Sequence, residues 1–296
     1  MKKYIVLFVV ALLLFTACQK VVDADKLLDT EEKVFVQSYL SPQDTVFRVH
    51  VSRVFPSIGT PLSVRDDEAN EAKFLIKDAQ VSISDETGNS TNLSYSEENR
   101  AYLANANTLV IMSNQSYFLK VITDGETFNA SCQIPEKVAE INGRINLRDN
   151  GFGGQDADID LSFQDLIGKR NFYVLGGLVT TTYQYQGEEP QTSSYPLFFD
   201  SDKFLSDALE DGGILNGRSL NSFGGEIDIL DATITLQLTN VEEILFQNLK
   251  SAATNANADG NPFVEYSIAP NNFKEEGAIG VFAGYQLTEK VIELDL

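Results

Sequence analysis

Hydrophobic and polar residues alternate with a period of two along most of the chain. In residues 45–53, Phe47, Val49 and Val51 occupy one face, whereas His50 lies on the other. This spacing predicts a β-strand with one buried face. The same alternation, bounded by turns rich in Gly, Asn and Asp, predicts further strands at residues 79–84, 93–95, 117–121, 128–134, 141–147, 159–163 and 232–238.

The predicted strands fall into two groups, which meet at Pro135. Residues 34–135 carry closely spaced strands with no helical period between them, which predicts an immunoglobulin-like β-sandwich. Proline ends the last of these strands and marks a domain boundary. Residues 136–296 predict a second β-rich, sandwich-like domain, with a buried strand at Phe172–Tyr185 and closing strands at Ala278–Tyr285 and Val291–Leu296.

Two short helices are predicted within the second group. The first spans about residues 201–210, because Phe204, Leu205, Ala208 and Leu209 are spaced as on one helical face. The second spans about residues 240–254, since Thr239-Asn240-Val241-Glu242 has the form of a capping box. The expected fold class is therefore all-β, with an N-terminal sandwich, a second β-rich domain and two short helices.

The N-terminus has the pattern of an export signal. Lys2 and Lys3 precede the apolar run Tyr4–Phe15, which is shorter than the roughly 20 residues needed to span a bilayer. Phe15-Thr16-Ala17-Cys18 is similar to a lipobox, with Phe where Leu is usual. We therefore expect residues 1–17 to be removed, Cys18 to carry a diacylglyceryl lipid, and residues 18–33 to form a tether. An ordinary cleaved signal with a chance cysteine is the alternative.

The second cysteine is predicted to be a core residue. In residues 127–134, Phe128, Ala130, Cys132 and Ile134 share one face of a strand. No Lys, Arg or His within the strand lowers the pKa of the thiol. We therefore expect Cys132 to pack in the core as a small hydrophobic side chain.

The chain is strongly acidic, with a formal charge of −21. Loss of Lys2 and Lys3 with the signal leaves 20 basic against 43 acidic residues, a charge of −23. This balance disfavours nucleic acid and anionic lipid as partners, so membrane contact is expected through the lipid. Asp156, Asp158 and Asp160 invite a calcium interpretation, but Leu161 stands where an EF-hand loop requires glycine. A strand with its acids facing water explains them better, and the loop Asn255–Asn261 is an equally weak metal candidate.

The sequence contains no recognisable catalytic motif. Its one histidine, His50, lies on the polar face of a strand and is expected to be dispensable. One histidine excludes any site with two histidine ligands, and neither a nucleophile elbow nor a phosphate loop is present. With 43 acids, a carboxylate pair for glycoside hydrolysis remains open. No catalytic residue, metal ligand or cofactor is therefore predicted.

Aromatic residues are concentrated between the buried strand and the first predicted helix. They serve either as core and scattered surface residues, which we favour, or as a face that binds sugar, peptide or protein. The residues are Tyr173, Tyr183, Tyr185, Tyr195, Phe198 and Phe199.

Ten short segments follow one another along the chain: Ser41-Pro42, Ser52-Arg53, Asp78–Val81, Tyr117–Val121, Ala130–Pro135, Phe163-Gln164-Asp165, Asn171-Phe172-Tyr173, Phe199-Asp200, Gly260–Phe263 and Gly277–Tyr285. In their order and spacing, these segments resemble the Bacteroidota lipoprotein family known as domain of unknown function 4249. The chain departs from the family where Asn271-Asn272-Phe273 replaces the usual Asn-Ile pair.

The resemblance implies an outer-membrane lipoprotein, on the periplasmic or the surface face, without an established activity. Members are often encoded beside TonB-dependent receptors, so it also implies such a β-barrel as partner. The leading expectation is thus a non-enzymatic binding or accessory protein. A hydrolase that uses acidic residues and a structural or adhesive surface protein are the alternatives.

Overall fold

The computed structural model describes residues 31–55, 67–185, 187–200, 202–208, 210–224, 228–258 and 267–295. The predicted signal peptide, Cys18 and most of the predicted tether lie outside these residues. Within them, no helix is long and apolar enough to cross a membrane.

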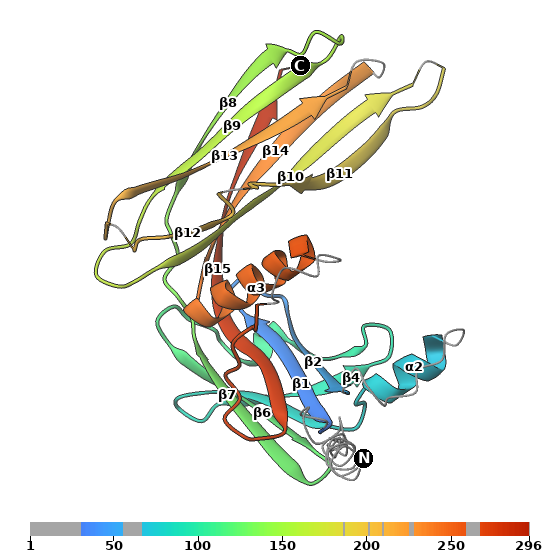
Figure 1. The fold of residues 1–296 in the computed structure, drawn as a ribbon, viewed down its shortest axis with the longest axis vertical. Helices are drawn as coiled ribbons and strands as arrows, with labels where there is room; N and C mark the ends of the chain where they lie inside the picture. The colour runs from blue at the N-terminus through green and yellow to red at the C-terminus, as the bar shows by residue number, and fades with distance from the viewer. Residues whose placement is uncertain are drawn as a thin grey trace, which may run out of the picture.

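The described chain is mostly β and forms two sandwich-like bodies (Figure 1). The prediction of an all-β fold with sandwich-like layers is confirmed. The strands are β1 (Lys33–Leu40), β2 (Val46–Val54), β3 (Gln80–Asp85), β4 (Ser90–Ser96), β5 (Ala101–Asn105), β6 (Ser116–Thr123), β7 (Glu126–Gln133), β8 (Ile141–Asp149), β9 (Gln155–Gln164), β10 (Phe172–Gln184), β11 (Gln191–Leu197), β12 (Phe204–Ser206), β13 (Ile214–Phe223), β14 (Asp228–Val241) and β15 (Ala278–Leu294), and the helices are α2 (Asp67–Phe74) and α3 (Glu243–Ala258).

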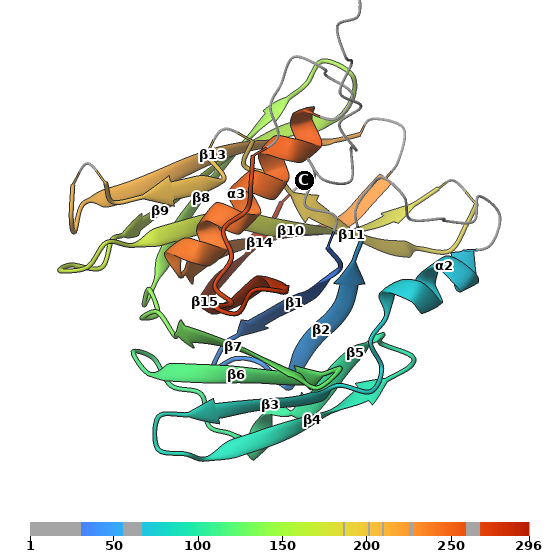
Figure 2. The same ribbon diagram turned by 60° about the horizontal axis from the view of Figure 1, so that its bottom comes forward.

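The first sandwich wraps its strands around one core in the order β15-β1-β2-β5-β4-β3-β6-β7 (Figure 2). Strand β4 crosses from one sheet of the sandwich to the other. Its first part pairs with β3 through Thr91 and Leu93, and its second part pairs with β5 through Ser94 and Tyr95. The inward residues of the alternating strands fill the core, among them Phe47, which is buried. Burial of such side chains is the main source of stability for the sandwich.

Side chains close the seam between β7 and β15, the two ends of this strand order. The Glu275 carboxylate accepts hydrogen bonds from the backbone N–H and the amide of Asn129, at 3.0 and 2.7 Å. Asn272 donates to the Ser131 carbonyl at 3.1 Å, and Glu242 accepts from the Gln133 N–H at 2.8 Å. Three side chains thus satisfy the backbone of β7, which would otherwise be an open sheet edge.

The second sandwich packs the sheet β11-β10-β14-β15 against the sheet β13-β9-β8. Its core comes from the alternating residues of both sheets, including Leu161, Phe163 and Leu236, all of which are buried. The three acids at Asp156, Asp158 and Asp160 lie on the opposite face of β9 from these residues, as the alternation predicts.

One strand belongs to both sandwiches. The first part of β15 pairs in parallel with β1, from Val34 opposite Ala278 to Leu40 opposite Gly284. Its second part pairs with β14, from Val241 opposite Tyr285 to Ala232 opposite Leu294. The predicted strands Ala278–Tyr285 and Val291–Leu296 are therefore one strand of 17 residues. Although residues 273–284 lie beyond the predicted boundary at 135, they pack in the first sandwich through Phe273, Ala278 and Phe282.

Helix α3 lies across the junction of the two sandwiches (Figures 1 and 2). Leu245 and Phe246 pack on Phe172 of β10, and on Val281 and Ala283 of β15. This apolar cluster, together with β15, joins the two sandwiches at their adjoining ends.

The helix prediction was right in one place and wrong in two. The helix predicted at 240–254 is α3, but the predicted capping box is wrong because Thr239–Val241 continue β14 and Glu242 contacts β7. The helix predicted at 201–210 is also wrong. Residues Phe204–Ser206 form β12, which pairs with Phe172–Val174 of β10, while α2 at 67–74 was not predicted.

Candidate functional site

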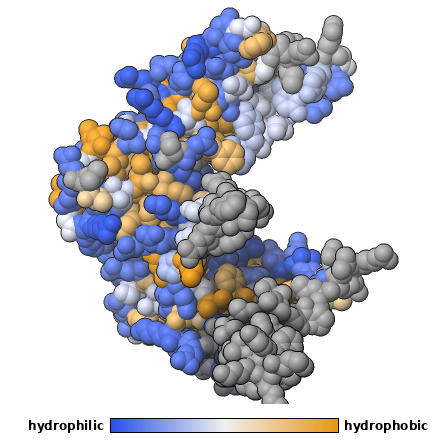
Figure 3. Space-filling view, viewed as in Figure 1, coloured by the Kyte–Doolittle hydropathy of each residue, from blue (hydrophilic) through white to orange (hydrophobic). Residues whose placement is uncertain are grey.

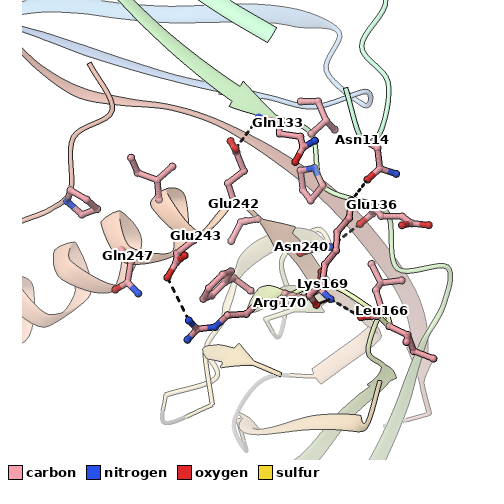
Figure 4. A pocket seen from close by; sticks show the side chains of 18 residues that line it. Asn114, Gln133, Glu136, Leu166, Lys169, Arg170, Asn240, Glu242, Glu243 and Gln247 are labelled. Carbon is pink, nitrogen blue, oxygen red and sulfur yellow. Dashed lines mark hydrogen bonds and ion pairs between the residues drawn. The ribbon is translucent and has the colours of Figure 1, made fainter. Parts of the chain in front are cut away.

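A pocket of about 640 Å³ lies where the sandwiches meet, and we call it the junction pocket (Figure 4). It is built by the loop before β6, the linker from β7 to β8, the loop from β9 to β10, and the end of β14 with the start of α3. Its lining residues are Asn114, Gln133, Ile134, Pro135, Glu136, Leu166, Ile167, Lys169, Arg170, Asn171, Phe172, Asn240, Val241, Glu242, Glu243, Ile244, Gln247 and Pro270.

Glu242 bridges the two strands that border the pocket on the side of the first sandwich. One carboxylate oxygen accepts from the Gln133 N–H at 2.8 Å, and the other accepts from the Gly284 N–H at 2.6 Å. Burial raises the pKa of Glu242 to about 6, although these two donors act in the opposite direction. Both carboxylate oxygens of Glu242 therefore accept hydrogen bonds from backbone N–H groups, one on β7 and one on β15.

The basic side chains of the pocket are also paired. Lys169 donates to the Asn114 side chain at 2.9 Å, which links the loops of the two sandwiches. The Arg170 guanidinium lies 4.0 Å from Glu243 and 5.0 Å from the centre of the Phe172 ring. Arg170 and Glu243 are both more than half exposed, so this ion pair adds little stability. It places two opposite charges side by side on the exposed part of the pocket lining.

The outer face of the second sandwich presents a different kind of surface, which we call the threonine face. Register places Leu178 of β10 between Pro196 of β11 and Thr235 of β14, with Val291 of β15 next in the row. Neighbouring hydroxyls meet across the strands, as between Thr180 and Ser194 at 2.8 Å. The outward residues in the central part of β10, β11 and β14 are Val174, Gly176, Leu178, Thr180, Thr182, Thr192, Ser194, Pro196, Thr233, Thr235, Gln237 and Thr239.

None of these outward residues is charged, in a chain with a formal charge of −21. Charged residues border this set. Asp231 of β14 is exposed and lies opposite Thr182, while on β15 Glu289 accepts from Gln237 at 2.7 Å and Glu293 lies opposite Thr233. Leu178 is 38% exposed and Val291 is 63% exposed. Figure 3 shows the molecule hollowed on one side between the two sandwiches, and pale residues over β10 and β11 line the upper wall of that hollow.

The residues considered above as candidate metal ligands or catalytic groups do not lie together in the structure. Asp156 and Asp158 form ion pairs with Arg148, and Asp160 pairs with Arg218, so these acids lie on a solvated strand face. His50 is half-buried, with its ring edge-on to Phe35 and Nδ1 3.3 Å from the Arg100 carbonyl. The predicted loop Asn255–Asn261 is wrong in its first part, since residues 255–258 belong to α3 and Asn255 exchanges hydrogen bonds with Ser267. Residues 259–261 lie outside the described chain.

Cys132 is buried in the first core, as predicted, and burial raises the pKa of its thiol. The aromatic group is divided: Tyr173 and Phe199 are core residues, whereas Phe198 is 64% exposed and Tyr183 packs edge-on against Tyr185. These side chains do not form a single binding face.

The sequence of the chain matches a known family. The sequence profile of a domain of unknown function, DUF4249, matches residues 20–291. The chain belongs to this family. No curated protein matches this DUF4249 chain.

Three residues that carry the resemblance to DUF4249 form one buried hydrogen-bond network beside the junction pocket. The Tyr173 hydroxyl donates to Asp165 at 2.6 Å, and burial together with this bond raises the pKa of Tyr173. Asn171 donates from its amide to the Leu166 and Lys169 carbonyls at 2.7 and 2.8 Å. The network shapes the loop from β9 to β10, and the spacing of these residues in the sequence does not reveal it.

Proposed function

We propose that this protein is a lipid-anchored, non-enzymatic accessory protein of the bacterial outer membrane that binds a TonB-dependent receptor. The lipid is attached to Cys18, and the receptor docks on the threonine face. The proposal rests chiefly on one observation, the uncharged central part of the threonine face in an otherwise acidic protein. A flat face of small, hydroxylated and apolar residues can be desolvated against a partner at low electrostatic cost.

The order of the strands supports this orientation. β1 begins at the end of the first sandwich that lies away from the junction, because Val34 pairs with Ala278 and Leu40 with Gly284. β15 then continues away from that end and runs the length of the second sandwich. A chain anchored through the residues before β1 therefore holds the first sandwich near the membrane and carries the threonine face outward. Confinement in the plane of the membrane raises the effective concentration of neighbouring receptors.

The junction pocket favours binding over hydrolysis. A glycosidase needs two carboxyl groups that face one substrate. In this pocket both oxygens of Glu242 accept backbone N–H groups, and Glu243 pairs with Arg170. Two of the three acids of the pocket, Glu242 and Glu243, thus serve its architecture, and the third, Glu136, is exposed.

The test is site-specific photo-crosslinking of the complete lipoprotein in native membranes. A photoreactive residue at Val291 on the threonine face should capture a β-barrel receptor. The same residue at Asn146, which is exposed on the opposite sheet, is the matched control. Equal capture from both positions, or capture of the protein by itself alone, contradicts the proposal.

A charge substitution gives the second arm of this test. Thr235→Lys should reduce the crosslink yield from Val291 at least about fivefold, because a lysine must then lose water at the interface. Asn146→Lys adds the same charge on the other sheet and should leave the yield unchanged. Deletion of residues 136–296 is unsuitable as a test, because it also removes the part of β15 that completes the first sandwich.

A further inference from the structure

Three acidic side chains from two loops converge at the lower end of the second sandwich. Asp165 follows β9, Asp207 follows β12 and Asp211 precedes β13. One carboxylate oxygen from each lies within 4.8 Å of the other two. Asp165 and Asp207 are 3% and 7% exposed, whereas Asp211 is exposed.

Most of the carboxylate oxygens in this cluster accept a hydrogen bond. Asp165 accepts from the Tyr173 hydroxyl at 2.6 Å and from the Gly212 N–H at 2.8 Å. Asp211 accepts from the Gly168 N–H at 3.0 Å, and Asp207 Oδ2 accepts from the Asn171 N–H at 3.0 Å.

Asp207 Oδ1 is the exception. It is fully buried and accepts no hydrogen bond from any residue in the described chain. A buried carboxylate oxygen without a partner costs free energy, because it has lost its water and gained nothing in return.

The cluster also lacks a balancing positive charge. The basic residues that line the same pocket, Lys169 and Arg170, are engaged with Asn114 and Glu243 respectively. Across the part of the chain that the structure describes, none of the ion pairs includes Asp165, Asp207 or Asp211. Three carboxylates at this separation repel one another, and burial of two of them strengthens the repulsion.

We propose that Asp165, Asp207 and Asp211 bind a divalent cation, with Ca²⁺ as the preferred ion. All three donors are carboxylate oxygens, the ligands of hard cations. Ca²⁺ holds oxygens at 2.3–2.6 Å, so ligands on opposite sides of the ion stand about 5 Å apart. The three oxygens lie within 4.8 Å of one another, which is close enough for one such ion to contact all of them. Mg²⁺ is usually held through one or two carboxylates, so a set of three carboxylates favours Ca²⁺.

The surroundings allow an ion to enter and remain partly hydrated. A pocket of about 640 Å³ is lined by Asp207 and Asp211 together with Gly168, Lys169, Arg170 and Ala208. Ca²⁺ takes six to eight ligands, so water in this pocket completes the coordination that three carboxylates begin. Asp207 Oδ1 has no hydrogen-bond donor among the described residues, so a cation held by this carboxylate would compensate its burial.

The ion would connect the loop of residues 165–171 to Asp207 and Asp211. Leu166, Ile167, Lys169 and Arg170 of the first loop also line the junction pocket. Binding of Ca²⁺ therefore fixes one wall of that pocket. This inference does not depend on the proposed receptor.

Terbium luminescence on the purified mature protein tests the site directly. Tb³⁺ occupies calcium sites, and nearby aromatic rings excited in the ultraviolet sensitise its emission. The chain has no tryptophan, and the Tyr173 hydroxyl lies 2.6 Å from a proposed ligand residue. We expect saturable emission that excess Ca²⁺ displaces. Tyr173→Phe should lose most of this emission while Ca²⁺ affinity, measured by calorimetry, changes less than about tenfold.

Isosteric variants locate the ligands. Asp207→Asn and Asp211→Asn should each lower Ca²⁺ affinity at least about tenfold, because each removes a charged ligand. They should also abolish the rise in melting temperature that Ca²⁺ gives the wild type. Asp158→Asn, which changes an exposed acid paired with Arg148, is the matched control and should retain both responses.

Asp211 is exposed, so Asp211→Asn provides a folded protein even if Asp207→Asn does not fold. The proposal is overturned if the wild type shows no saturable binding up to about 10 mM Ca²⁺. Binding that Asp211→Asn leaves unchanged would also overturn it.

Discussion

At the scale of single residues, the first core contains two neighbouring tyrosines with opposite hydrogen-bonding states. Tyr95 and Tyr102 pack edge to face, with ring centres 5.3 Å apart. The Tyr102 hydroxyl accepts from the Ala79 N–H and donates to the Ile76 carbonyl, both at 2.8 Å. The Tyr95 hydroxyl is buried without a partner among the described residues. A comparison of these two tyrosines therefore separates the contribution of the hydroxyl group to stability from the contribution of the aromatic ring.

Tyr102→Phe should therefore lower the free energy of unfolding by about 1–3 kcal/mol, since a buried N–H loses its acceptor. Tyr95→Phe removes an unsatisfied hydroxyl and should be neutral or stabilising. Chemical denaturation of both variants measures the difference. Equal destabilisation of the two would show that the bonds of Tyr102 contribute nothing specific.

Glu242 gives a prediction for pH. Its pKa rises from 4.5 to about 6 on folding, so between these values the folded protein binds more protons than the unfolded chain. The contribution of Glu242 to stability is then greatest below pH 4.5 and declines as pH rises through 6. Glu242→Gln cannot ionise, and the decline should be absent from its unfolding free energy between pH 4.5 and 7. Parallel pH profiles for the variant and the wild type would contradict this.

Sequence periodicity identified some of these residues and missed others for a physical reason. Cys132 and His50 were placed correctly because alternation within one strand determines which face a side chain occupies. Glu242, Asp207 and Asp211 act across seams between segments far apart in the chain. No local period records such contacts, and only the folded structure brings them together.

At the scale of elements, the mistaken helix at 201–210 shows where periodicity is ambiguous. Phe204 packs on Phe246 of α3, whereas Leu205 faces the core of the second sandwich. Adjacent apolar residues on opposite faces fit a strand between two hydrophobic layers as well as a helix. Pairing of Phe204–Ser206 with β10 then decides in favour of the strand. The surrounding strands were predictable because their alternation continues for longer.

Gly280 is the element-scale position most sensitive to substitution. Its φ of +142° is rare for residues with side chains, and a Cβ there would overlap the Val36 carbonyl of β1. Gly280→Ala should destabilise the protein by about 3 kcal/mol or more. Gly176→Ala in β10 is the control, since its Cβ would meet only the Gln237 side chain at 3.9 Å. Thermal unfolding of both variants tests the prediction, which similar melting temperatures would refute.

At the scale of the whole molecule, the two sandwiches do not divide at a single point in the chain. Pro135 follows β7, yet the first sandwich is completed only by residues 273–284. Local patterns predict each strand, but the pairing of β1 with β15 joins residues more than 200 positions apart. The two sandwiches should therefore unfold together.

The anchor is tested on the whole molecule as well. Cys18→Ser should prevent lipidation and leave an unprocessed or soluble product, because several acyl chains provide the firm attachment of a lipoprotein. Membrane fractionation and mass spectrometry of the N-terminus measure the outcome. A serine variant that stays in the membrane fraction with unchanged processing would refute the lipobox interpretation.

The strand shared by both sandwiches has a mechanical consequence. In the proposed arrangement, the lipid pulls on the start of β1, while a receptor held by the second sandwich pulls on the far end of β15. Because the two strands are parallel, this tension shears their seven residue pairs, Val34–Ala278 to Leu40–Gly284, all at once. Resistance to force depends on the barrier to unfolding, and simultaneous rupture raises that barrier above that of opening pairs one by one. In the proposed arrangement, the pairing of β1 with β15 would therefore carry load between the membrane and the receptor.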